Sequence, residues 1–255
     1  MTIRAAAHAG VFYPATAPAL HTAMAHYLDD AREGGGTPAA LVAPHAGWRY
    51  CGAVMASAFR GLSRGAVSRV IHLGPSHYHA LSGIVASGAS SFATPLGAVP
   101  VVDVTGDGVA SDAAIHAPEH ALEVQLPFLQ AILGDFEYIP LLVGDGDPGD
   151  LAALLESLGA MRAGVLTVVS SDLSHYLPPA EARARDLGTL RQVEALDPRL
   201  NTAQACGAAA LNGVMALAAG QGWSALALDR RDTVQTGGIP RDTVVGYAAT
   251  AFYRR

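Results

Sequence analysis

The sequence predicts a single-domain α/β protein with a central, mostly parallel or mixed sheet flanked by helices. Short apolar segments alternate with helical patterns along much of the chain, as in repeated strand–helix–strand units. Hydrophobic residues make up 51% of the 255 residues, which is enough for a sizeable core. Because no linker or shift in composition divides the chain, we expect residues 1–255 to form one domain.

Apolar runs bounded by Gly, Pro or Ser predict the strands. Buried strands are expected at 39–43, 69–73, 83–87, 136–143 and 165–169, and closing strands at 223–228 and 244–252. The turn-rich segment 93–102, which contains Pro95 and Gly97, predicts a hairpin-like piece. These strands supply the sheet of the predicted fold.

Helical spacing of apolar residues predicts the helices. They are expected at 52–62, 119–133, 148–158, 180–196 and about 206–219. Within 119–133, Pro127 indicates either a kink or a helix that starts late. At helical spacing His116, His120 and Glu123 would share a polar face, at i, i+4 and i+7.

The charged and sulfur-containing residues exclude several classes of function. Sixteen basic residues, all Arg, stand against 22 acidic ones, a net charge of −6. The lack of Lys excludes a lysine Schiff base and a P-loop lysine. The acidic balance, with no basic run longer than two residues, argues against nucleic-acid binding. Two cysteines, Cys51 and Cys206, are too few for a disulfide scaffold.

The distribution of apolar residues gives no sign of a membrane protein. No apolar run approaches the roughly 18 residues of a membrane span. Arg4, His8 and Pro14 interrupt the N-terminal segment, which therefore does not resemble a signal peptide. We expect a cytoplasmic protein that binds neither membrane nor nucleic acid.

Three histidines follow expected strands directly. His45 comes after 39–43, His77 after 69–73 and His175 after 165–169. Because the carboxyl ends of parallel strands lie at one edge of a sheet, we expect these imidazoles to meet there. The alternative is that each histidine only satisfies the hydrogen bonds of a turn.

The other histidines are interpreted by their surroundings. His120 and Glu123 either lie on a solvated helix face or point into a cleft, as acid/base groups or as groups that orient the ligands. His72, inside an apolar strand, is expected to be a hydrogen-bonded core residue. Surface or turn positions are expected for the N-terminal histidines His8, His21 and His26.

Strand-end imidazoles favour a metal site over the common alternatives. GxSxG and GxGxxG are both absent, which argues against a serine hydrolase and a dinucleotide-binding fold. Two strand-end histidines with a third ligand suit a mononuclear metal site with open positions. Imidazole accepts Zn, Cu, Fe or Ni, and a thiolate as third ligand favours Cu or Zn while permitting Fe.

Several motifs together resemble the Memo family, whose prokaryotic members are also called AmmeMemoRadiSam system protein B. The motifs are AHAGVFYPA, PHAGWRYCG, LGPSH, EHALEVQLPFLQ, SSDLSHY and VVGYAA, and they run from about residue 4 to residue 252. The resemblance implies a fold similar to class III extradiol (LigB-like) dioxygenases. It also implies that His45, His77 and Cys206 bind a metal, with Asp172 and His175 lining the same cleft.

The resemblance leaves three functions open. The first is a redox enzyme with one transition metal ion, iron or copper rather than zinc. His175 would be its acid/base, tuned by Asp172, and His120 and Glu123 would support the site. The second is a non-catalytic module that binds a small molecule or peptide. The third is an accessory subunit of a radical-SAM and AMMECR-type system. An Ala-rich helix face could also support a homodimer.

Overall fold

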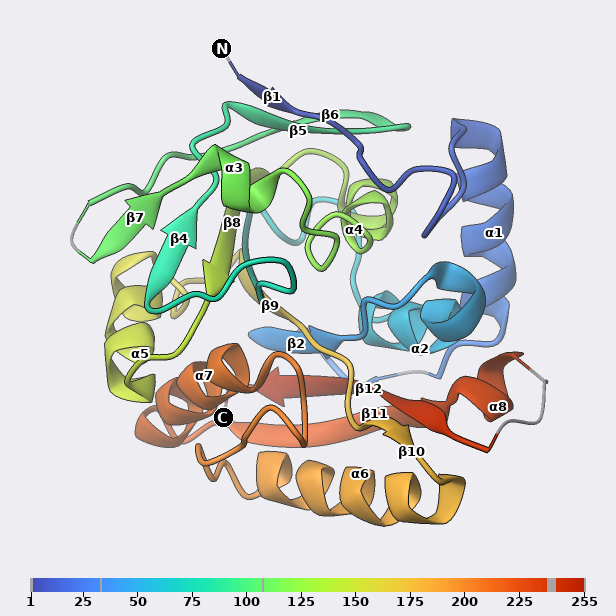
Figure 1. The fold of residues 1–255 in the computed structure, drawn as a ribbon. Helices are drawn as coiled ribbons and strands as arrows, with labels where there is room; N and C mark the ends of the chain where they lie inside the picture. Colours follow the sequence, from blue (N-terminus) through green and yellow to red (C-terminus); the bar gives the residue numbers. More distant parts are fainter. Residues whose placement is uncertain (1, 33, 107, 238–241, 255) are drawn as a thin grey trace.

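The fold is built on a mixed β-sheet (Figure 1). The structure is a computed structural model, and it describes residues 2–32, 34–106, 108–237 and 242–254. Its strands are β2 (Ala40–Ala43), β3 (Arg69–Gly74), β4 (Ile84–Ala86), β7 (Val109–Ser111), β8 (Glu137–Val143), β9 (Val165–Ser170), β10 (His175–Leu177), β11 (Ser224–Asp232) and β12 (Val244–Tyr253). Across the described residues this sheet has nine strands, in the order β10-β12-β2-β9-β3-β8-β4-β7, with β11 paired to β12.

The middle of the sheet is parallel. β2 pairs with β9, β9 with β3, and β3 with β8, all in parallel, whereas β12 and β4 are antiparallel to their neighbours in this group. Ala43 pairs with Ser170, and Leu73 pairs with Val169, so these three strands end side by side. The prediction that the segments after β2, β3 and β9 meet at one edge is confirmed.

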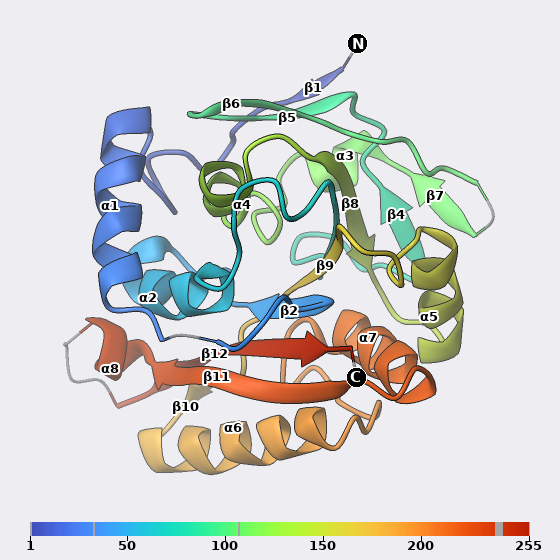
Figure 2. The ribbon, with the colours of Figure 1, turned by 180° about the vertical axis from the view of Figure 1, so that it is seen from behind.

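Helices cover both faces of the sheet (Figures 1 and 2). One core contains residues of α1 (Ala17–Asp29), α2 (Trp48–Phe59) and α4 (Leu126–Leu133), and the other contains residues of α5 (Pro148–Ser157), α6 (Pro179–Glu194) and α7 (Ala208–Gly220). Neighbouring residues of β3 divide between them, Val70 toward the first core and Ile71 toward the second. Alternation along each buried strand therefore fills two cores at once.

A small second sheet lies beside this body. It contains β1 (Ile3–Arg4), β5 (Ser91–Thr94) and β6 (Gly97–Pro100) in the order β1-β5-β6. β5 and β6 form the hairpin predicted at 93–102, although β5 begins two residues earlier. β1 pairs in parallel with β5, so the start of the described chain forms an edge of this small sheet.

The segment 119–133 is helical only in its second half, so the late start that Pro127 indicated is confirmed, and a kinked helix over the whole segment is wrong. Only α4, Leu126–Leu133, is helical, and Pro127 lies in its first turn, where a missing N–H costs nothing. The short helix α3 (Ala113–His116) ends before a turn that carries His120 and Glu123. His116, His120 and Glu123 therefore do not share a helix face.

Other differences are smaller. α2 begins at Trp48 rather than at residue 52, and α7 begins at Ala208 rather than at residue 206. α1 was not predicted, although Pro18 near its start and the buried Leu20 and Met24 at i, i+4 are helix signals. In the described ranges, no helix is both long and apolar enough to cross a membrane.

Candidate metal centre

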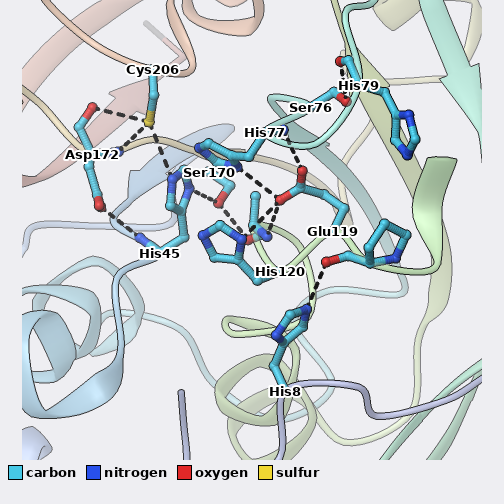
Figure 3. Close-up of polar contacts among 12 residues, drawn as sticks. His8, His45, Ser76, His77, His79, Glu119, His120, Ser170, Asp172 and Cys206 are labelled. Atoms are coloured by element: carbon cyan, nitrogen blue, oxygen red, sulfur yellow. Dashed lines mark hydrogen bonds and ion pairs between the residues drawn. The ribbon is translucent and has the colours of Figure 1, made fainter. Parts of the chain in front are cut away.

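Two imidazoles and a thiol meet at the carboxyl edge of the sheet (Figure 3). His45 follows β2, His77 follows β3, and Cys206 precedes α7. The Sγ atom of Cys206 lies 3.3 Å from Nε2 of His45, and the ring centroids of His45 and His77 are 4.9 Å apart. One ligand atom from each of the three residues lies within 4.8 Å of the others. Metal–sulfur and metal–nitrogen bonds of about 2.3 and 2.0 Å place such atoms about 3.3–3.6 Å apart, so the donors fit one ion.

Close contact between α7 and the end of β9 positions Cys206. The N–H of Asp172 donates to Sγ over 3.2 Å, and the N–H of Gly207 donates to Oγ of Ser171 over 2.9 Å. A Cβ at residue 207 would lie 2.7 Å from the main-chain oxygen of Ser170, so only Gly allows this approach. Burial, reinforced by Asp172, raises the pKa of the Cys206 thiol to about 12. A thiolate here therefore needs a cation beside it.

The buried hydroxyl of Ser170 determines which ring nitrogen of His45 carries the proton. Oγ of Ser170 lies 2.6 Å from the carbonyl oxygen of Ala121, which can only accept, so the hydroxyl donates there. The same oxygen accepts from Nε2 of Gln125 at 3.0 Å and lies 2.7 Å from Nδ1 of His45. Nδ1 must therefore be the donor, which leaves the Nε2 lone pair directed at Cys206. Burial, followed by the charge of His77, lowers the pKa of His45 well below its usual value.

A carboxylate that the sequence analysis did not select orients His77. Glu119 accepts from the N–H of His77 over 2.6 Å and from its ring Nδ1 over 2.9 Å. Burial alone would raise the pKa of Glu119, but these hydrogen bonds hold it at about 2. The ionised Glu119 thus keeps Nδ1 of His77 protonated and leaves Nε2 free for a metal. The sequence contained one indication of this role, because Glu119 directly precedes His120 in the EHALEVQ motif.

The centre borders a cavity of about 590 Å³. His45, His77, His120, Asp172 and His175 all line it, so the structure brings these expected site residues together. The cavity is also lined by Phe12, Tyr50, Tyr78, Tyr176 and Tyr247. Cys206 lines a separate cavity of about 430 Å³ with Ser76 and His79.

Asp172 connects the strand ends. Its Oδ1 accepts from the N–H of His45 over 2.9 Å, which fixes the loop after β2 to the loop after β9. The side chain is almost fully buried, and burial raises its pKa. Asp172 and His175 interact electrostatically, although no direct hydrogen bond between them is present among the described contacts.

Glu123 lies away from the cavity. It is fully buried, and its carboxylate pairs with Arg4, accepts from the Tyr13 hydroxyl over 2.6 Å and accepts from the His8 N–H over 2.8 Å. These contacts attach the N-terminal segment to the turn after α3. His120 instead stacks on His77, with ring centroids 4.6 Å apart.

The expectations for His72 and for the N-terminal histidines hold. His72 is fully buried, with Nδ1 2.9 Å from the Tyr138 hydroxyl and Nε2 3.0 Å from Oε1 of Gln125. Cys51 is fully buried in α2. His21 and His26 are exposed, and the partly buried His8 contacts the carbonyl of Pro118 in a turn.

The fold and the site together define a class of protein. The chain is an α/β protein whose parallel strand ends, with the start of a helix, gather two imidazoles and one thiol beside a cavity. A family model described as "Memo-like protein" matches residues 4–251. The chain belongs to the Memo family, which shares the LigB-like fold, and the resemblance found in the sequence is confirmed.

Named relatives agree with this assignment. A MEMO1 family protein of Thermotoga maritima is 33% identical over 219 residues, which cover 77% of this chain and 79% of the relative. A MEMO1 family protein of Aeropyrum pernix is 35% identical over 223 residues, covering 78% and 79%. The Protein memo-1 homolog of Caenorhabditis elegans is 36% identical over 185 residues, covering 68% of this chain and 53% of the relative.

Proposed function

We propose that this protein is a metal-dependent redox enzyme of unknown substrate, with His45, His77 and Cys206 as the ligands of one transition metal ion. The supporting observation is the 3.3 Å approach of Sγ of Cys206 to Nε2 of His45, whose lone pair Ser170 leaves free. Two neutral imidazoles and a thiolate form a soft donor set that favours copper and also accepts iron. Three protein ligands leave positions open for a small molecule.

The bound ion and the residues around it would have different roles in the reaction. The bound ion would supply a redox-active Lewis acid at the cavity wall. His175, on the same wall, is assigned the transfer of a proton to or from the bound molecule. Asp172 holds the main chain of His45 and adds negative charge beside His175. Glu119 fixes the His77 ring.

Metal content tests the proposal. We would purify the protein without oxygen and without a tag, and measure iron, copper and zinc by inductively coupled plasma mass spectrometry. We expect near-stoichiometric iron or copper in the wild type, and a loss of about one equivalent of metal per chain in His45→Ala and Cys206→Ser. Cys51→Ser, a change at the other buried cysteine, and His21→Ala, at an exposed histidine, are matched controls that keep the metal.

The loaded protein is then screened for redox chemistry. Reduction and reoxidation are followed by absorption spectroscopy, and oxygen uptake is measured with catechols and thiols. Trace metal in the wild type that reconstitution does not raise would overturn the metal centre. Stoichiometric zinc alone would overturn the redox activity and leave a ligand-binding module.

A further inference from the structure

We propose that a second metal ion binds between Glu119, His120 and the Nδ1 atom of His77, so that the His77 ring bridges two ions. The bridge rests on the proposed function, because the first ion is the one held by His45, His77 and Cys206. The second ion is divalent and suited to nitrogen and oxygen donors, such as zinc or iron(II). Its three ligands are a second cluster within 4.8 Å of one another.

The distances between the donors suit one ion. Oε1 of Glu119 lies 2.9 Å from Nδ1 of His77 and 3.3 Å from Nδ1 of His120. Bonds of about 2.0–2.2 Å to nitrogen and oxygen at angles near 90–110° place donor pairs about 2.9–3.5 Å apart. The carboxylate is only 2% exposed, so water competes little for it.

An unpartnered nitrogen points to the same position. Nδ1 of His120 is buried and makes no hydrogen bond to the described residues, although it lies 3.3 Å from a carboxylate oxygen of Glu119. That oxygen already accepts from Nδ1 of His77 and from the N–H of Ala121, at 2.9 Å each. Buried polar atoms without a partner are rare, and an unseen ion is one of the recognised reasons for them. An ion at this position gives Nδ1 of His120 a partner.

The surrounding rings hold His120 in place. Its ring stacks on His77 at 4.6 Å and lies 4.7 Å from the ring of Phe12 and 5.7 Å from that of His8. A ligand whose ring is fixed before binding loses little side-chain entropy when the ion arrives. The position is therefore prepared for binding and does not have to be assembled.

Charge and donor type distinguish the two ions. Without the second ion, Nδ1 of His77 carries a proton and donates it to Glu119. A cation bound at this position would take the place of that proton, which would leave to solvent, and Glu119 would then hold the His77 ring through the cation. No electron is transferred in this step. Two imidazoles and a carboxylate are harder donors than two imidazoles and a thiolate, so the second position selects zinc or iron(II) over copper(I).

Zinc binding to the full chain tests the second ion. Metal-free protein is dialysed against buffered Zn²⁺, and the bound zinc per chain is measured. We expect two equivalents for the wild type and for the control His21→Ala. We expect one for His120→Phe, which keeps the ring packing, one for Cys206→Ser, and none for the double variant. Glu119→Gln is the second variant for the same site, should circular dichroism show that His120→Phe is not folded.

Cobalt distinguishes the two positions by colour. Co²⁺ bound to the thiolate gives a sulfur-to-metal charge-transfer band, which we expect to saturate at one equivalent. The second equivalent is expected to add only ligand-field bands, which His120→Phe removes. One equivalent in both the wild type and His120→Phe would overturn the second ion and leave the first. Two equivalents that survive in Cys206→Ser would instead overturn the thiolate centre.

Discussion

At the residue scale, the hydroxyl of Ser170 determines which nitrogen of His45 can bind a metal. It donates to a carbonyl and accepts from Nδ1 of His45, so only one tautomer fits. Gln125 donates to the same hydroxyl and accepts from His72. A row of hydrogen bonds therefore runs from the buried core to the metal ligand, and it fixes the ring before any ion arrives.

Ser170→Ala should weaken metal binding without removing a ligand. The Nδ1 N–H of His45 loses its acceptor, so the ring can rotate or change tautomer, and we expect affinity to fall about 10–100-fold. Competition with a coloured chelator measures this. Ser57→Ala removes another buried hydroxyl, which donates to Asp229 over 2.9 Å, and should leave the affinity unchanged. Equal affinity in Ser170→Ala and wild type would contradict the role of the hydroxyl.

At the element scale, apolar runs predicted the strands well because a buried parallel strand needs little else. They could not show that residues 119–125 are not helical, because Leu122 and Leu126 keep helical spacing there. In the structure the side chains of Glu119 and Glu123 accept hydrogen bonds from distant parts of the chain, and these contacts hold the segment in a non-helical conformation. Tertiary hydrogen bonds determine the conformation of that segment, and a local sequence pattern does not reveal them. α1 was missed although Pro18 near its start and its apolar spacing are helix signals.

The join between α7 and β9 gives a prediction at this scale. In Gly207→Ala the new methyl would meet the carbonyl of Ser170 at 2.7 Å, so α7 must shift and carry Cys206 with it. We expect weaker metal binding and a lower melting temperature. In Gly220→Ala, at the other end of α7, the new methyl meets none of the described residues within 4 Å, so this change should stabilise the fold by about 0.5–1 kcal/mol. Calorimetry and metal titration of both variants check this; normal affinity in Gly207→Ala would refute it.

At the scale of the whole molecule, the predicted strands located only those site residues that directly follow a strand. His45, His77 and His175 were found because parallel strands deliver them to one edge. Cys206 came only from the family resemblance, because a cysteine before an Ala-rich helix has no local mark of a ligand. Glu119 was missed because its role depends on contact with His77, 42 residues away in the chain.

Buried neutral imidazoles make the whole fold sensitive to acid. Burial lowers the pKa of His72 to about 3 and that of His116 to about 4. Unfolded chains take up these protons below about pH 6.5 while the folded protein does not. The stability that these residues contribute is therefore complete above pH 6.5 and is lost as the pH falls toward 4 and 3. Each residue adds a slope of about 1.4 kcal/mol per pH unit within that window.

Urea unfolding of the metal-free protein between pH 7 and pH 4 measures this dependence. His72→Gln removes one of these protons, so its stability should fall less steeply with acid, whatever its stability at pH 7. His21→Gln, at an exposed position, should keep the wild-type slope. An unchanged slope in His72→Gln would mean that His72 takes up its proton in the folded protein. The Tyr138 hydroxyl would then have to change from donor to acceptor, because Nδ1 of His72 becomes a donor, whereas Nε2 already donates to Gln125.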